Sequence, residues 1–339
     1  MTYTEQDYTP RYSFIIPVYN RPDEVDELLD SLTRQEFRDF EVIIVEDGSA
    51  IPCREIAEKY TDRLTLQYFT KPNSGPGQTR NYGAERANGE YLIILDSDCL
   101  LPATYLNAVE EELQCAPCDV FGGPDRAHPS FSDIQKAINY SMTSFFTTGG
   151  IRGGKKKMDK FYPRSFNMGL RRDVYHALGG FSHMRFGEDI DLSIRIFNEG
   201  YRCRLFPEAW VWHKRRTDLK KFFKQVHNSG MARINLYKKY PDSLKLVHLL
   251  PALFTLGTLL LLVGSIFCLY SLTPLLLYAL LVGVDATIRN RSLRIGAYSV
   301  AASFVQLIGY GTGFLRAWWS RCIRHQSTEA EAFKKNFYN

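Results

Sequence analysis

Short apolar runs alternate with segments of helical periodicity along the first 125 residues. The runs Tyr12–Val18 and 40–45 are nearly continuous and rich in β-branched residues, which is typical of strands that are buried on both faces. Between them, Pro22 opens a segment with apolar residues at positions i, i+3, i+4 and i+7. This spacing predicts a helix that covers the two strands.

The same alternation continues beyond residue 60. Two further strands are expected at 64–69 and Tyr91–Leu95, and a polar helix is expected between them at about 78–87. Strands that alternate with helices make a doubly wound, mainly parallel α/β sheet. Ligands of such sheets bind at the carboxyl ends of the strands, so the chemistry is sought there.

The hydropathy pattern changes completely near the C-terminus. Between Lys245 and Asp285 lie 39 residues without a formal charge, whereas one membrane-spanning helix needs about 20 apolar residues. We therefore expect two transmembrane helices separated by a break at 271–274, and 295–315 is a weaker third candidate because it contains Gln306 and several glycines. The alternative reading is that these segments are buried helices of a soluble domain.

The arginines after the apolar segments leave the number of spans open. Arg289, Arg291 and Arg294 fit a cytoplasmic loop after two spans, but a third span would put the later arginines outside, against the positive-inside tendency. A re-entrant or interfacial third segment would remove the conflict. The N-terminus shows no charged and then apolar leader region. The expected location is the cell (inner) membrane, with the catalytic part in the cytoplasm.

Charge is distributed unevenly, although the net charge is only +5. Residues 1–151 hold 12 basic and 25 acidic side chains, and residues 152–245 hold 22 and 9. An acidic first half repels phosphates, so we expect no nucleic-acid partner. The basic residues before the apolar segments either reflect topology and attraction to anionic lipid or hold the phosphates of a lipid diphosphate that the protein binds.

Polar side chains gather at three predicted strand ends, at 17–21, 46–49 and 96–98. Asp96 and Asp98 are spaced i, i+2, which aims both carboxylates in the same direction at a strand end. Two hard oxygen ligands of this kind suit Mg²⁺ or Mn²⁺, with further ligands from water and a diphosphate. An ordinary turn explains any one of these clusters taken alone.

A second group of acids lies at 187–195. Its acids Glu188, Asp189 and Asp191 precede an apolar helical face, so they are placed near a helix N-terminus, where the helix dipole favours negative charge. A well-capped helix is the simpler interpretation. Further along, His213 stands between tryptophans and basic residues. By itself, such a histidine is more often structural than a ligand.

These motifs, taken in order, resemble those of family 2 glycosyltransferases. The resemblance covers about residues 11–216 and rests on six segments: Phe14-Ile15-Ile16-Pro17-Val18-Tyr19-Asn20-Arg21, Val45-Glu46-Asp47-Gly48-Ser49, Gly77-Gln78-Thr79-Arg80-Asn81-Tyr82-Gly83, Asp96-Ser97-Asp98, Gly179-Gly180-Phe181 and Gly187-Glu188-Asp189-Ile190-Asp191-Leu192. It implies a GT-A fold and an inverting transfer from a nucleotide-diphosphate sugar, UDP- or GDP-linked, assisted by Mn²⁺ or Mg²⁺.

The resemblance also implies a role for each matching residue. The nucleotide would be lined by Pro17, Tyr19, Asn20, Arg21 and Asp47, and Arg80 would approach the nucleotide or diphosphate. Asp96 and Asp98 would bind nucleotide and metal, and His213 would contact the metal or diphosphate. Asp189 would be the base, with Glu188 and Asp191 on the acceptor side. Glu46 departs from the pattern, since many members have Asp there. The expected acceptor is a lipid-linked or other glycan.

Other functions remain open at this point. A processive polysaccharide synthase shares such a catalytic core, but the Gln-x-x-Arg-Trp motif of those enzymes is absent, its nearest match being Gln225-Val226-His227-Asn228-Ser229. A non-catalytic membrane scaffold that binds nucleotide sugars is a second alternative. A nucleotidyltransferase is a third, disfavoured because its Gly-rich opening loop is missing.

Three functional regions follow from these observations. We expect a nucleotide-sugar-binding half at 1–125, an acceptor-binding and catalytic half at 126–245, and membrane-anchoring helices with a short tail at 246–339. Addition of one sugar per encounter is favoured over polymerisation.

Overall fold

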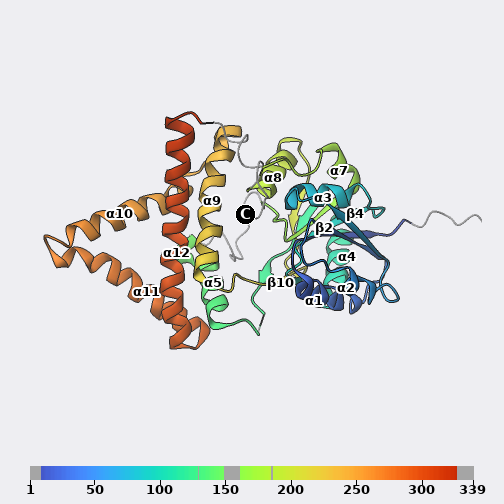
Figure 1. Cartoon of the computed structure of the whole chain (residues 1–339), viewed down its shortest axis with the longest axis horizontal. Helices are drawn as coiled ribbons and strands as arrows, with labels where there is room; N and C mark the ends of the chain where they lie inside the picture. Colours follow the sequence, from blue (N-terminus) through green and yellow to red (C-terminus); the bar gives the residue numbers. More distant parts are fainter. Residues whose placement is uncertain (1–8, 129, 149–160, 185, 327–339) are drawn as a thin grey trace, which may run out of the picture. The chain divides into compact units, whose positions relative to one another are not determined.

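A computed structural model describes residues 9–128, 130–148, 161–184 and 186–326 of the chain (Figure 1). These residues form two compact units. The first contains 9–126 and 161–213, and the second contains 127–148 and 214–326. The predicted first half therefore ends close to a boundary between units, whereas the segment 126–245 is shared between both.

The first unit is built on a seven-stranded sheet. Its strands are β1 (Tyr12–Val18), β2 (Phe40–Asp47), β3 (Leu66–Lys71), β4 (Tyr91–Leu95), β6 (Val120–Gly122), β8 (Asn167–Arg171) and β9 (Cys203–Leu205). Their order is β3-β2-β1-β4-β8-β6-β9, and only β8 runs antiparallel to its neighbours. The mixed, mostly parallel α/β sheet confirms the predicted fold class.

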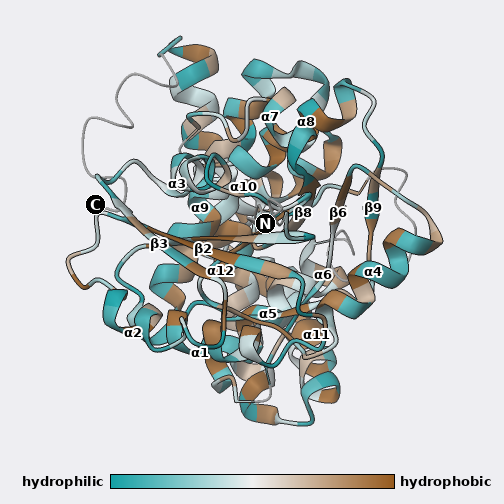
Figure 2. Ribbon diagram, turned by 90° about the vertical axis from the view of Figure 1, so that its right-hand side faces the viewer, coloured by the Kyte–Doolittle hydropathy of each residue, from teal (hydrophilic) through white to brown (hydrophobic). Residues whose placement is uncertain are grey.

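Helices cover both faces of this sheet (Figure 2). Alternate strand residues point to opposite faces, so Phe14 and Ile16 enter one core while Ile15 enters the other. The first core is closed by α1 (Pro22–Thr33), α2 (Arg54–Glu58) and α4 (Tyr105–Cys115), and the second by α3 (Pro76–Ala84), α7 (Arg172–Ala177) and α8 (Glu188–Asn198). Strands β1, β2 and β4 are buried on both faces, as their continuous apolar runs predict, whereas β3 is partly exposed.

A small second sheet in the same unit joins three distant segments. It consists of β5 (Cys99–Leu100), β10 (Val211–His213) and β7 (Asp125–Arg126), in that order. The antiparallel register pairs His213 with Cys99, directly after Asp98. This pairing brings the Asp-x-Asp motif next to a histidine more than 100 residues further along.

The described part of the second unit is helical. It contains α5 (Asp133–Thr143), α6 (Phe145–Thr148), α9 (Leu219–Lys239), α10 (Leu250–Gly264), α11 (Thr273–Asn290) and α12 (Leu293–Trp318), with short 3-10 turns at Pro241–Ser243, Leu246–His248 and Leu269–Leu272 and a π-turn at Trp319–Ile323. Two segments are long and apolar enough to cross a membrane, Leu246–Gly264 and Leu269–Asn290. Only 11% of each apolar window is buried, unlike the core helices of soluble proteins.

The third apolar stretch is placed differently. Helix α12 lies alongside α9 in the second unit (Figure 1), and a Cβ on Gly313 would collide with the carbonyl of His227 in α9. Its glycines therefore allow close approach of two helix backbones. Residues such as Ser299, Leu307 and Phe314 of α12 are buried in this packing.

Candidate active site

The end of β2 carries two acids that face opposite ways. Asp47 is fully buried, and its carboxylate accepts hydrogen bonds from Lys71 Nζ at 2.7 Å and from the amides of Ser74 and Gly75, both at 2.9 Å. Glu46 points to the other side and accepts from the amide of Cys53 at 2.9 Å and from the Tyr68 hydroxyl at 2.6 Å. Both acids therefore hold loops in place.

Asn20, which follows β1, holds the loop after β2 in place. Asn20 adopts a left-handed backbone with φ of 54°, a conformation that asparagine tolerates. Its side-chain oxygen accepts from the amides of Ala50 and Ile51 at 2.7 and 3.0 Å. Arg21 pairs with Glu24 at 2.6 Å. The remaining predicted nucleotide-lining residues here, Pro17 and Tyr19, are half-buried.

Arg80 connects the two acidic motifs. It rises from α3 and is only 3% exposed. Its Nη2 donates to Asp96 Oδ1 at 2.7 Å, and its Nη1 donates to Glu188 Oε1 at 3.3 Å. Burial lowers the pKa of Arg80, but Asp96 and Glu188 raise it above the usual value, so the cation is retained. The guanidinium also lies 5.2 Å from the centre of the Phe181 ring.

The acids at the start of α8 have distinct surroundings. Burial, and then the charge of Asp189, raise the pKa of Glu188 to about 7, although Arg80 opposes the shift. Asp189 Oδ2 lies 3.4 Å from Arg164 Nε, and its Oδ1 accepts from the amide of Ile190 at 2.8 Å. The Asp189 side chain remains 16% exposed, so a substrate can reach it.

Asp191 is different from these two acids. It is fully buried, and its Oδ2 lies 3.0 Å from the guanidinium of Arg195. Arg195 also donates to the carbonyls of Leu178 and Gly180. These contacts tie α8 to the turn after α7, which gives Asp191 structural surroundings rather than an open face toward an acceptor.

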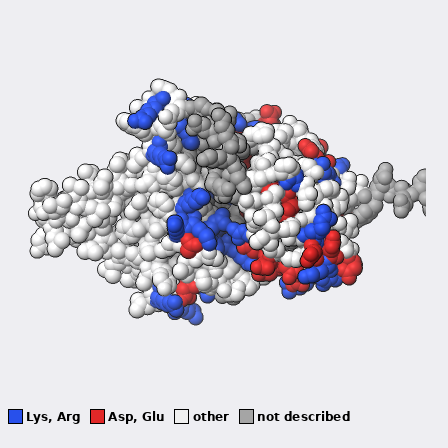
Figure 3. All heavy atoms as spheres, in the orientation of Figure 1, with Lys and Arg blue, Asp and Glu red and all other residues white. Residues whose placement is uncertain are grey.

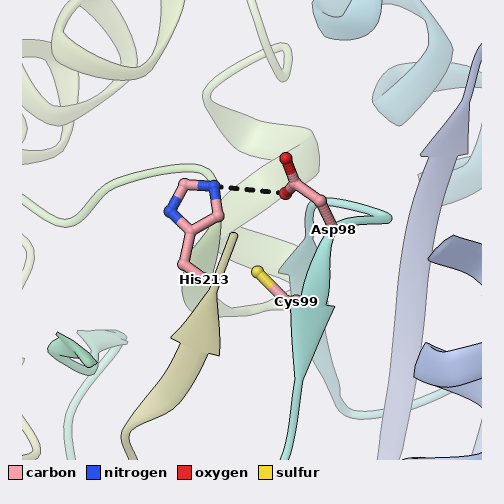
Figure 4. A group of neighbouring side chains, drawn as sticks. All are labelled: Asp98, Cys99 and His213. Carbon is pink, nitrogen blue, oxygen red and sulfur yellow. Dashed lines mark ion pairs between the residues drawn. The ribbon is translucent and has the colours of Figure 1, made fainter. Parts of the chain in front are cut away.

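Asp98, Cys99 and His213 form a cluster on the small sheet (Figure 4). Asp98 Oδ1 lies 3.1 Å from His213 Nε2, and one potential ligand atom from each of the three residues lies within 4.8 Å of the others. Burial, followed by the charges of Asp98 and Asp96, raises the pKa of the Cys99 thiol well above its usual value. Without a bound cation the thiol therefore stays protonated, and it donates to the carbonyl of Phe166 at 3.4 Å.

Other residues orient the histidine. Its Nδ1 lies 3.9 Å from Asp125 Oδ2, and its ring stacks on Phe166 with centroids 4.7 Å apart. Sequence reasoning names the loop of Arg164 and Phe166 only as one that sets specificity, and it does not predict Asp125 or Cys99, because their places depend on pairing between distant strands. The position of Cys99 directly after Asp98 was the one local signal.

A mostly parallel sheet with carboxylates at the end of its central strand β4 defines a GT-A type of fold. Residues 13–179 match the family described as Glycosyl transferase family 2. This segment, about half of the chain, is therefore assigned to glycosyltransferase family 2.

Individual proteins agree with this assignment. The chain is 33% identical to the uncharacterized glycosyltransferase EpsJ of Bacillus subtilis, over 59% of this chain and 60% of that protein. It is also 33% identical to an uncharacterized glycosyltransferase of Rickettsia felis, over 42% of this chain and 23% of that protein. The chain thus spans less than two thirds of the length of either curated relative.

A solved structure has a similar fold. The mannosyltransferase PcManGT from Pyrobaculum calidifontis, in complex with GDP-Man and Mn²⁺, superposes with a TM-score of 0.56 and 20% identity. The match covers 93% of this chain and 89% of that one. At this identity the likeness concerns the fold alone.

Proposed function

We propose that this protein is an inverting glycosyltransferase that moves a sugar from a UDP- or GDP-linked donor to a hydroxyl of a lipid-linked glycan. The observation that carries the proposal is the Arg80 bridge, which ties Asp96 of the Asp-x-Asp motif to Glu188 beside Asp189. One buried cation thereby holds the donor-side and acceptor-side acids in one site. PcManGT, with GDP-Man and Mn²⁺ bound, and family membership support the donor class.

Asp189 is the proposed base. In an inverting displacement, the acceptor hydroxyl attacks C1 of the sugar while the bond from C1 to the diphosphate oxygen breaks, and the hydroxyl proton passes to the Asp189 carboxylate. Arg164 and the Ile190 amide hold that carboxylate by its two oxygens. A positioned base of this kind contributes roughly 10²–10⁴-fold to the rate.

A divalent cation fits the other end of the site. Asp98 and His213 would hold it with oxygen and nitrogen donors, which suit Mn²⁺, and Asp96 would be available beside them. When bound, the cation supplies Lewis-acid stabilisation of the leaving diphosphate. Arg80 adds a fixed positive charge near Asp96, and the Phe166 ring stacks on the His213 ring.

The membrane is the proposed location of the acceptor. Two exposed apolar helices, α10 and α11, support attachment to the cell (inner) membrane with the first unit in the cytoplasm. The best match to a polymerase motif, 225–229, lies inside α9 and lacks the Arg-Trp pair, which supports transfer of a single sugar. Basic residues of α9 are proposed to attract the acceptor phosphates.

The test is a donor screen with the full chain in lipid vesicles. Radiolabelled UDP- and GDP-sugars are offered with a lipid extract as acceptor, with Mn²⁺ or with a chelator. We expect one donor to yield a labelled lipid of a single added sugar, and only with the cation present. Long polymer would favour the processive alternative, and no turnover of any donor would favour the scaffold.

A further inference from the structure

The connection between α10 and α11 is an exposed apolar turn. Ile266, Phe267, Leu269 and Tyr270 are each exposed on more than 70% of their surface, and residues 246–284 carry no formal charge. Figure 3 shows this end of the second unit without acidic or basic side chains on the visible face. A turn that emerged into water beyond a membrane would instead be polar.

Both helices rest on α12 through the parts that lie away from the turn. Ala252 and Thr258 are the buried residues of α10, Val282 and Ala286 are those of α11, and the Tyr278 ring of α11 lies 5.6 Å from the ring of Phe304 in α12. The remaining helical residues, 259–264 and 273–277, rise by about 9 Å and about 8 Å at 1.5 Å per residue. The hydrocarbon core of a bilayer is about 30 Å thick, so the free part of the hairpin reaches less than halfway across.

Helix α12 cannot follow the hairpin into hydrocarbon. It packs along α9, in which five lysines are exposed, namely Lys220, Lys221, Lys224, Lys238 and Lys239. These lysines lie at the two ends of α9, but Arg233 lies near its middle, and an arginine at the centre of a bilayer costs about 2.5–3.5 kcal/mol or more. The pair α9 and α12 therefore lies outside the hydrocarbon, and only the part of the hairpin that extends beyond α12 can enter it.

The two serine hydroxyls of the turn and several of its amides are paired within the hairpin. The Ser265 hydroxyl donates to the carbonyl of Leu262 at 2.7 Å, and the Ser271 hydroxyl donates to the carbonyls of Cys268 at 2.8 Å and Leu261 at 3.1 Å. The amides of 265–268 also donate to carbonyls at the end of α10. Internal pairing is required of a backbone that lies in lipid, where water is absent.

Basic side chains surround the base of the hairpin. Lys245 precedes α10, and Arg289, Arg291 and Arg294 follow or end α11, all of them exposed. Two acids pair with these residues: Asp285 lies 2.9 Å from Arg289 and accepts from the Tyr140 hydroxyl at 2.6 Å, and Asp133 lies 3.3 Å from Arg294. Each such basic residue near an anionic surface contributes about 1 kcal/mol of attraction.

We propose that α10 and α11 form a re-entrant hairpin that enters one leaflet of an anionic phospholipid bilayer and returns to the same side. The turn at 265–272 lies in hydrocarbon, and the basic residues at the base contact the phosphates. This inference rests on the membrane location proposed above. It also removes the conflict over the arginines after α12, because all of them remain on the side of the first unit.

Native cysteines test the inference in sealed vesicles of both orientations. A membrane-impermeant sulfonated maleimide is added, and labelled peptides are identified by mass spectrometry. Cys115, exposed on α4, reports the side of the first unit, and Cys268 reports the turn. We expect Cys268 to be protected in both orientations and labelled after detergent is added. The variant Leu246→Cys, at the exposed base, is the matched control and should label together with Cys115.

Phe267→Cys in a Cys268→Ser background repeats the measurement at a second turn position. Labelling of the turn only from the side opposite Cys115 would mean two complete spans, which overturns the re-entrant hairpin and leaves the membrane location intact. Labelling from the same side as Cys115 would mean that the turn lies in water and would overturn both. Sugar transfer, measured on the same vesicles, reports the proposed function separately.

Discussion

The ends of β2 and β4 both carry paired acids, but the protein uses them differently. At the end of β2, the Asp47 side chain is 1% exposed and its two oxygens accept from Lys71 and from the loop after it. At the end of β4, the Asp96 side chain is 32% exposed and Asp98 is 17% exposed. The carboxylate of Asp47 thus holds a loop at the end of β2, whereas those of Asp96 and Asp98 remain accessible at the end of β4.

The difference shows how accessibility separates structural acids from reactive ones. A buried carboxylate that accepts several hydrogen bonds from the protein has few lone pairs left to bind a ligand. The acids around Arg80 are held from one side by a single guanidinium, which leaves their other oxygen atoms for substrate or cation. Mutations should therefore affect stability at β2 and turnover at β4 and α8.

The largest expected effect is at Asp189. Asp189→Asn removes the proton acceptor while keeping the shape of the side chain, so kcat should fall by roughly 10²–10⁴-fold, with donor binding retained. Steady-state transfer and binding of the labelled donor measure the two quantities. Glu199→Gln, at the exposed end of the same helix, is the control and should stay active. Near-native turnover of Asp189→Asn would remove Asp189 from the mechanism.

Asp47 provides the structural side of the comparison. Asp47→Asn breaks the buried pair with Lys71 and sets an amide against donating backbone N–H groups, which costs about 3–5 kcal/mol for buried pairs of this kind. Thermal unfolding of the detergent-solubilised protein should show a clearly lower Tm. In the double variant with Lys71→Met, part of the loss should be recovered. If unfolding were unchanged and donor binding were lost, Asp47 would be a nucleotide ligand and the comparison would fail.

Removal of the Asp98 carboxylate should weaken cation activation. In Asp98→Ala, the Mn²⁺ concentration that gives half-maximal transfer should rise by more than the roughly 10–100-fold typical of outer-shell changes. Cys99→Ser should alter it little, because the thiol donates to the carbonyl of Phe166 at 3.4 Å and a hydroxyl can do the same. Mn²⁺ titrations of transfer measure both, with Cys118→Ser as a control at a buried thiol away from the cluster. A loss in Cys99→Ser equal to that in Asp98→Ala would make the thiol a ligand.

Local patterns predict the strands accurately and the functional contacts only in part. Tyr12–Val18 and Tyr91–Leu95 have the predicted bounds because continuous β-branched runs have few alternatives, whereas β2 runs to Asp47 and β3 is shifted to Leu66–Lys71. Spacing in sequence also placed Asp96 and Asp98 at the end of β4.

Long-range contacts could not be predicted in this way. The pairing of His213 with Cys99 and the contact of Arg164 with Asp189 join segments with no shared periodicity. The sequence also could not reveal the donors to Asp47, because a buried acid and an accessible acid have the same residue type. These donors are Lys71 at the end of β3 and the amides of Ser74 and Gly75 in the loop after it.

The smallest effect concerns Glu188, whose pKa is raised to about 7 by burial and by Asp189, net of the opposing effect of Arg80. Between the ordinary glutamate pKa, about 4.3, and 7, the folded state holds a proton that the unfolded state has released. The free energy of unfolding therefore falls as pH rises through this range. Glu188→Gln cannot ionise and avoids that loss.

The variant should therefore match the native protein near pH 5 and have a higher Tm near pH 8, by on the order of a few degrees. Thermal unfolding at the two pH values measures the difference, and Glu199→Gln, exposed at the other end of α8, should show none. A constant difference at both pH values would mean that Glu188 is ionised throughout the range. It would then belong with the fully paired acids at the end of β2 rather than with the accessible acids near β4.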